Sequence, residues 1–249
     1  MAGIVEYLGT EYAGFQRQRN KMTVQGVIEE AIESVTGERV TLTASGRTDA
    51  GAHAEHQVIS FVTSSALPTD VMRRALNAHL PTDVKVVRLT IAPPEFHPRF
   101  HAAQRTYRYV IWNRDTASPL WQGRAAHIRL PLDDRRMADA ANALVGEHDF
   151  SAFVKSAAPG GRRRRLDTLR VTRDGDLVTI EMTGSGFLRQ MARSIAGTLI
   201  GVGLGRLAAA DVGSILLSRD RLRAGETAPA CGLYLTDVQY PVSRDPFKE

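Results

Sequence analysis

The order in which strand-like and helix-like segments alternate constrains the fold of this chain more than any other feature. Apolar residues recur at helical spacing over 24–35, after a suitable N-cap at Thr23 and before Gly37. A second helix is predicted over 70–80, where Pro81 ends it. Strands are predicted over 4–7, 40–44, 57–62 and 84–91. The resulting order, β-α-β-β-α-β, is that of the split βαβ or ferredoxin-like unit.

Three prolines, Pro93, Pro94 and Pro98, mark a boundary, after which the cycle begins again. Helices are predicted over 133–144, 187–204 and 209–217, and strands over 106–112, 169–173, 177–182 and 233–238. We therefore predict an α+β protein of two ferredoxin-like halves with mainly antiparallel sheets. The predicted domains are residues 1–104 and 105–249.

Composition favours an anionic partner. The 32 basic residues exceed the 27 acidic ones, and only four of the basic residues are lysines. Arginine presents a planar fork that suits phosphate and nucleic acid, although a GC-rich genome would also favour arginine codons. The single cysteine, Cys231, excludes an internal disulfide and a Cys-only metal site, and it fits a reducing cytoplasm. We expect no membrane-spanning segment and no secretory leader, because the chain lacks the apolar stretches that both require.

The polar loop over 46–53, between two predicted strands, is the first candidate for chemistry. Its glycines allow the backbone to approach a ligand, and Asp49 has a guanidinium and a hydroxyl beside it, on Arg47 and Thr48. Asp49 is therefore a candidate nucleophile or base. The alternative is a tight loop in which Asp49 caps a turn and pairs with Arg47.

Three basic segments are candidates for contacts to nucleic acid. Arg189 and Arg193 are spaced to share a face of the predicted helix. The segment 105–109 carries Tyr107 and Tyr109 on one strand face, and Arg108 on the other, as stacking platforms or as core. The run 162–165, four adjacent arginines after Pro159-Gly160-Gly161 in a predicted loop, would contact phosphates or stay hydrated.

Cofactor chemistry has little support in the sequence. The turn over 184–187 resembles the start of a phosphate-binding turn, but Arg189 stands where the dinucleotide fingerprint needs a third glycine. The histidine pairs His53/His56 and His97/His101 have no further ligands nearby, so we predict no metal site.

Residues 46–53, Gly-Arg-Thr-Asp-Ala-Gly-Ala-His, resemble the signature of the tRNA pseudouridine synthase A family. Ala52 replaces the usual Val there, and Leu8 and Phe15 replace a common Asp and a common Trp elsewhere. None of these replacements removes a reactive group. The resemblance continues in order along nearly the whole chain, at Glu6-Tyr7, 12–18, Val24-Gln25, 77–81, 96–100, 105–109, 146–150, 187–188, 191–193, 228–230 and 232–235.

The resemblance implies isomerisation of uridine to pseudouridine in the anticodon arm of tRNA, at positions 38, 39 and 40. It implies a two-lobed subunit with the active-site cleft between the halves, a homodimer, and no cofactor or metal. Asp49 corresponds to the family's catalytic aspartate, Tyr107 to its active-site tyrosine and Arg193 to the basic partner of the aspartate. The residues expected to bind substrate are Arg17, Arg47, Tyr107, Arg108 and Leu235. The run 162–165 has no counterpart that we can assign.

The residues alone are also compatible with two other functions. A non-catalytic RNA-binding module could use similar sheets and arginines, and a glycosidase would also use an aspartate but needs a second carboxylate, which this loop lacks. Within the isomerase interpretation, Asp49 could attack C1′ of the ribose, add to C6 of the base, or take a proton from the sugar.

Overall fold

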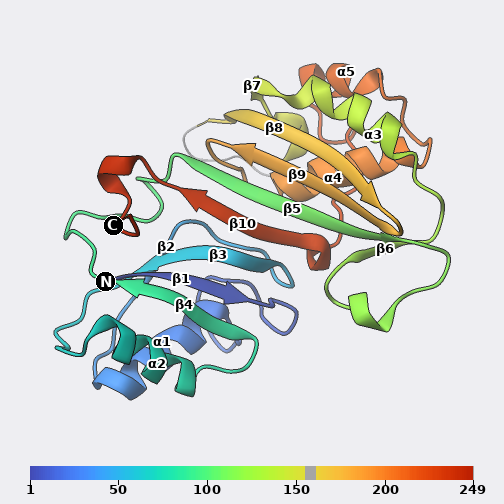
Figure 1. The fold of residues 1–249 in the computed structure, drawn as a ribbon. Coiled ribbons are helices and arrows are strands. Elements are labelled where there is room, and N and C mark those ends of the chain that lie inside the picture. Colours follow the sequence, from blue (N-terminus) through green and yellow to red (C-terminus); the bar gives the residue numbers. More distant parts are fainter. Residues whose placement is uncertain (155–160, 249) are drawn as a thin grey trace. The chain divides into compact units, whose positions relative to one another are not determined.

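Two compact units make up the chain in the computed structural model, which describes residues 1–154 and 161–248 (Figure 1). The first unit contains Met1–Ala103 and Tyr234–Glu249, and the second contains Gln104–Leu233. Each unit combines helices with strands that pair mainly in the antiparallel sense. The predicted class, a mixed α and β protein with mainly antiparallel pairing, is confirmed.

The first unit is built around strand β1 (Ala2–Tyr7), which pairs antiparallel with β3 (His53–Ser60) and with β4 (Val84–Thr90). The other edge of β3 is shared by two strands. At one end β2 (Thr43–Ala44) pairs antiparallel with it, and at the other end β10 (Leu233–Gln239) runs parallel to it.

The place of the last strand differs from the sequence prediction, which assigned residues 234–249 to the second half. In the structure Tyr234 and Leu235 pair with His53 and Ala54 of the first unit. Pairing along a sheet edge joins residues far apart in sequence, so the order of elements alone does not determine it. The predicted strand over 40–44 is also shorter, since only Thr43–Ala44 pairs.

Helices α1 (Val24–Thr36) and α2 (Thr69–His79) pack against each other in the first unit, and α2 packs against β4 (Figure 1). The predicted cap is confirmed: the Thr23 hydroxyl accepts a hydrogen bond of 3.2 Å from the amide of Gly26. Gly37 ends α1 in the left-handed conformation, with φ of 74°, which a residue without a Cβ adopts most easily.

The second unit has a sheet in the order β5-β9-β8-β7. Strand β5 (Gln104–Asn113) pairs with β9 (Leu177–Gly184), β9 with β8 (Arg163–Asp174), and β8 with β7 (Gly146–Asp149), all antiparallel. Strand β6 (Ala126–Ile128) runs parallel to the end of β5. The strands predicted over 169–173 and 177–182 lie within β8 and β9, which pair as a hairpin. The short strands β6 and β7 were missed, because three or four residues give no clear alternation.

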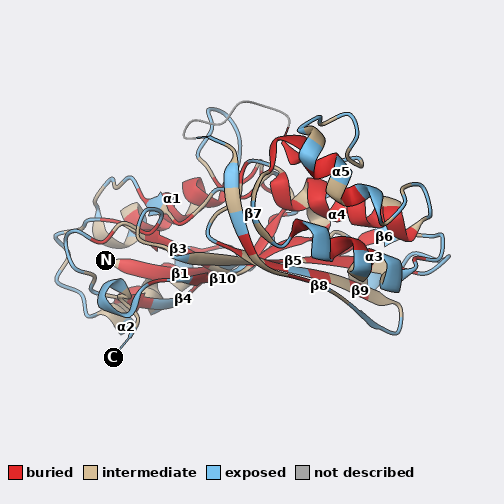
Figure 2. Ribbon diagram, turned by 90° about the horizontal axis from the view of Figure 1, so that it is seen from above, coloured by how far each residue is buried: buried red, intermediate tan, exposed pale blue. Residues whose placement is uncertain are grey.

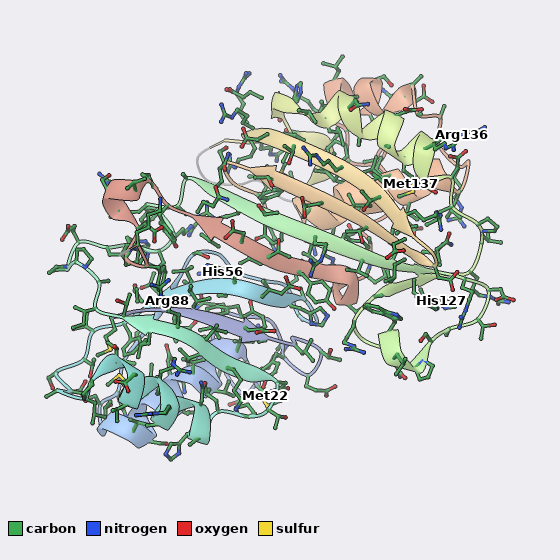
Figure 3. The ribbon with its side chains drawn as sticks, viewed as in Figure 1. Met22, His56, Arg88, His127, Arg136 and Met137 are labelled. Atoms are coloured by element: carbon green, nitrogen blue, oxygen red, sulfur yellow. The ribbon has the colours of Figure 1, made fainter. Side chains whose placement is uncertain are left out.

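Three helices complete this unit: α3 (Asp134–Ala141), α4 (Met191–Gly203) and α5 (Asp211–Ser218). Figure 2 shows α4 as mostly buried, which agrees with its apolar sequence. Met137 of α3, labelled in Figure 3, packs against Gly203 of α4, where a Cβ would leave it no room. Short 3-10 helices lie at Pro119–Trp121, Asn142–Leu144, Ser151–Phe153, Ala230–Gly232 and Val242–Arg244.

Two sequence predictions about basic residues are wrong. The helix expected over 187–204 begins only at Met191, because Gln190 has a φ of 61°, so Arg189 precedes the helix and shares no helical face with Arg193. Of the run 162–165, three arginines belong to β8 instead of a loop, because this strand pairs with β7 from Arg163 onward. Pro159 and Gly160 of the expected loop lie outside the described residues.

Candidate active site

The loop over 46–53 leads directly into β3 and is held at its start by a buried glutamine of that strand. The Gln57 amide donates a hydrogen bond of 2.9 Å to the carbonyl oxygen of Gly46, and it accepts one of 2.6 Å from the Ser45 hydroxyl. Gln57 is fully buried, so these bonds are shielded from water. Gln57 was not among the predicted site residues, because its only signal in the sequence is an amide among the apolar residues of a strand.

Thr48, which precedes the candidate catalytic aspartate, is held from two sides. Its hydroxyl lies 2.8 Å from the Tyr7 hydroxyl, and its carbonyl oxygen accepts a hydrogen bond of 3.1 Å from the amide of Phe15. Gly14 passes so close that a Cβ there would lie 2.9 Å from the same carbonyl oxygen. The polar segment after β1 therefore supports the backbone of the loop.

Asp49 begins a tight turn and is half-buried. Its carbonyl oxygen accepts a hydrogen bond of 3.1 Å from the amide of Ala52, and Gly51 has a φ of 80°. A turn with this hydrogen bond and a left-handed third residue is of type II, which requires glycine at that position. The turn therefore fixes the backbone of Asp49 without using its carboxylate.

The last residue of the loop has a structural role. The amide of Gly9 donates a hydrogen bond of 2.9 Å to Nδ1 of His53, and a Cβ on Gly9 would collide with the carbonyl oxygen of Ala52. An imidazole that accepts at Nδ1 is neutral, because imidazolium has donors only. His53 is fully buried and its ring lies 4.6 Å from that of Tyr234, centroid to centroid.

The two arginines expected to bind substrate in this unit differ in their surroundings. Arg47 is exposed, and within residues 1–154 and 161–248 its guanidinium makes no ion pair. The alternative in which Arg47 pairs with Asp49 is therefore not seen. Arg17 lies 2.7 Å from the buried carboxylate of Glu29 and 3.8 Å from that of Glu30, which offset its charge.

Leu235 lies in β10, fully buried and directly opposite Ala54 of β3. Since Ala54 follows His53, Leu235 lies next to the end of the aspartate loop, within the same unit. The structure thus brings Leu235 to the strand that carries the loop, although the two are far apart in sequence.

The expected active-site tyrosine, Tyr107, and the expected basic partner, Arg193, both lie in the second unit. Tyr107 is buried in β5, with its ring edge-on to Phe187 at 4.8 Å between centroids. Tyr109 is the core tyrosine: it is fully buried and its hydroxyl donates a hydrogen bond of 2.8 Å to the carbonyl oxygen of Pro229. Burial raises the pKa of the Tyr109 hydroxyl above its usual range, so it stays protonated.

Arg193 lies in the first turn of α4 and is hydrogen-bonded to the segment after α5. Its Nε donates a hydrogen bond of 2.8 Å to the carbonyl oxygen of Ala228, and the amide of Ala228 donates one of 3.1 Å to the carbonyl of Arg193. Arg108 is half-buried and lies opposite Glu181 of β9. The two hydrogen bonds with Ala228 therefore set the orientation of Arg193.

The described residues hold no group of three His, Cys, Asp or Glu side chains that could bind a metal ion. In the same part of the chain, no helix has the length and apolar character to cross a membrane.

The mixed α and β fold holds one half-buried aspartate on a glycine-supported loop. This arrangement is typical of an enzyme that uses a single carboxylate. Comparisons with known proteins then identify the family. The family model described as tRNA pseudouridine synthase matches residues 4–101 and 140–241. The chain is 45% identical over 237 residues to a protein of Pelobacter propionicus named tRNA pseudouridine synthase A, covering 95% of this chain and 97% of that protein.

Proteins of the same name from other bacteria are also similar. The one from Caldicellulosiruptor bescii is 43% identical over 95% of this chain and 97% of its own length, and the one from Acetivibrio thermocellus is 43% identical over 95% and 98%. Among solved structures, a chain of an archaeal box H/ACA sRNP Nop10-Cbf5 complex resembles this protein with a TM-score of 0.38 and 12% identity, over 80% of this chain and 44% of its own length. The chain belongs to the tRNA pseudouridine synthase family, as the sequence resemblance indicated.

Proposed function

We propose that this chain isomerises uridine to pseudouridine at positions 38, 39 and 40 of the anticodon stem-loop of tRNA, with Asp49 as the catalytic residue. Family membership supports the reaction, since the matching relatives are named tRNA pseudouridine synthase A. The catalytic role of Asp49 is supported by one observation, which is that the loop around it is held in place by the rest of the first unit. Buried side chains and two crowding glycines hold the backbone around it, and its carboxylate is left half-buried.

The reaction breaks the bond between C1′ and N1, rotates the uracil and rejoins it through C5. Asp49 acts as a carboxylate in each of three routes: attack at C1′, addition to C6, or removal of a sugar proton. Arg193, held by its hydrogen bond to the carbonyl oxygen of Ala228, acts as the basic partner of this carboxylate. Tyr107 stacks on the base and its hydroxyl relays a proton.

The substrate nucleotide must leave its stem before the enzyme can reach it. Flipping costs a few kcal/mol of unstacking, and contacts to phosphate offset that cost. Arg47, with its exposed guanidinium, is the best placed of the expected contacts, followed by Arg108 and Arg17. Leu235, beside the end of the aspartate loop, provides an apolar contact.

The wider arrangement is part of the same proposal. The order β4-β1-β3-β2 in the first unit supports a ferredoxin-like half. Of the proposed catalytic residues, Asp49 lies in the first unit, and Tyr107 and Arg193 lie in the second. The protein acts as a homodimer in the cytoplasm, without a cofactor.

Release of tritium tests the proposal. The chain is incubated with tRNA labelled with tritium at C5 of its uracils, and release to water is measured, because only rejoining through C5 displaces that hydrogen. Loss of release on changing U38, U39 and U40 to cytidine supports the assigned positions. Binding without release would indicate a non-catalytic RNA-binding module, and free uracil as product would indicate a glycosidase.

A further inference from the structure

The run of four arginines over 162–165 is not used by the proposed mechanism. Its members differ in burial and in their partners. Three of them lie in β8, where successive side chains point to opposite faces of the sheet. Arg163 and Arg165 are exposed on one face, whereas Arg164 is half-buried on the face that also carries the fully buried Leu166. Adjacent arginines therefore have different surroundings.

The two exposed arginines are neutralised by carboxylates. Nε of Arg163 lies 3.1 Å from Oε1 of Glu147, and Nε of Arg165 lies 2.8 Å from Oδ1 of Asp167. These pairs join β7 to β8 and brace β8 itself. Arg163 and Arg165 thus have structural partners.

Arg164 has no such partner. Its Nη1 donates hydrogen bonds of 2.6 Å and 3.3 Å to the carbonyl oxygens of Arg163 and Gly161, and no carboxylate pairs with it in the described part of the chain. Burial lowers the pKa of the Arg164 guanidinium, with no acidic group to counter the effect. A half-buried cation held by carbonyls alone is suited to an external anion.

The segment 185–190, which joins β9 to α4, has Arg164 beside it and two further arginines, Arg105 and Arg189. Cδ and Nε of Arg164 lie 3.8 Å from the place that a Cβ of Gly186 would take, and Nη1 of Arg105 donates a hydrogen bond of 3.3 Å to the carbonyl of Ser185. Arg189, within the turn, is exposed and unpaired among the described residues. Phe187, in the same turn, touches Tyr107.

We propose that Arg164, Arg105 and Arg189 form a phosphate clamp for the RNA backbone beside Tyr107, while Arg163 and Arg165 only stabilise the sheet. The guanidinium fork matches phosphate oxygens bidentately, so three such groups at one turn position a strand without reading its bases. The clamp rests on the proposed function, because it names a contact of the same RNA substrate. Arg164 is a positioning residue, and takes no part in the bond changes.

Filter binding of an unmodified tRNA transcript to the full chain tests the clamp over a series of KCl concentrations. Arg164→Ala is expected to raise Kd about tenfold and to lower the slope of log K against log[KCl] by about one, because one phosphate contact is lost. Arg163→Ala is the matched control, since it removes the same charge one residue away, and its Kd is expected to stay within about twofold.

The salt dependence of binding and the Arg163→Ala control together test the clamp. An Arg164→Ala protein with unchanged Kd and slope overturns the clamp, and so does an Arg163→Ala protein that loses as much affinity, since binding would then follow net charge alone. Thermal unfolding confirms that each variant folds, and Arg164→Gln replaces the alanine variant where it does not. Tritium release by the unaltered chain reports on isomerisation separately, so the clamp and the proposed function can fail independently.

Discussion

The amide of Phe15 donates a hydrogen bond of 3.1 Å to the carbonyl oxygen of Thr48, the residue before Asp49. This bond joins the segment after β1 to a loop more than thirty residues later in the sequence. Because the supports of the loop engage its backbone and the Thr48 hydroxyl, the carboxylate of Asp49 can be changed without removing them.

Replacement of Asp49 by Asn is expected to abolish turnover, because a neutral amide of the same size can neither attack nor take a proton. Tritium release should fall by at least about a thousandfold, while Kd for tRNA stays within several fold. A variant that still forms pseudouridine at a measurable rate would remove Asp49 from the mechanism.

The two tyrosines of β5 should respond differently to loss of their hydroxyls. Tyr107→Phe is expected to slow single-turnover isomerisation about a hundredfold with little change in Kd, because only proton transfer is affected. Tyr109→Phe leaves the Pro229 carbonyl unpaired, so it should cost about 1 kcal/mol of unfolding free energy, or about 2 to 4 °C in Tm, with activity retained. An unchanged rate for Tyr107→Phe would leave stacking as its only role.

Gly14 and Gly37 offer a matched pair of backbone substitutions. Both have positive φ, of 95° and 74°, so alanine at either should cost about 1 to 2 kcal/mol of stability. Only at Gly14 would the new Cβ also press on the Thr48 carbonyl, at 2.9 Å, whereas Gly37 has nothing within 4 Å. Gly14→Ala is therefore expected to lower kcat about tenfold to a hundredfold.

Gly37→Ala should keep the kcat of the unaltered chain. Equal activity of the two alanine variants would show that the segment after β1 does not position the aspartate loop.

Stability at acidic pH should depend on Asp134. Its carboxylate lies 2.5 Å from Nε of Arg173, and this hydrogen bond holds the pKa of Asp134 below its usual range. A lowered pKa in the folded state adds stability above the unfolded pKa of about 3.9, which is lost as pH falls through the folded pKa. Urea unfolding of Asp134→Asn against pH should show a smaller loss of stability below about pH 4 than the unaltered chain shows. Parallel curves would mean that the pair contributes nothing.

Local signals carried most of the correct sequence predictions. The Thr23 cap, the left-handed Gly37 and the two-residue turn of the β8–β9 hairpin depend on neighbouring residues only, so they could be found without the fold. The motif around Asp49 was equally visible, and the comparisons confirm the family that it indicated. The residue roles within the site, and the pairing of Asp49 with Arg193, stay predictions.

Tertiary structure decided what depends on distant partners. Capping, turn chemistry and motif spacing are properties of a few adjacent residues, and the sequence by itself determined them. Strand pairing determined that Leu235 lies beside Ala54, and strand direction determined that Arg164 separates from Arg163 and Arg165. Both depend on which edges and faces are free once the chain has collapsed, since backbone groups must pair and apolar faces must be covered, and no local pattern encodes that choice.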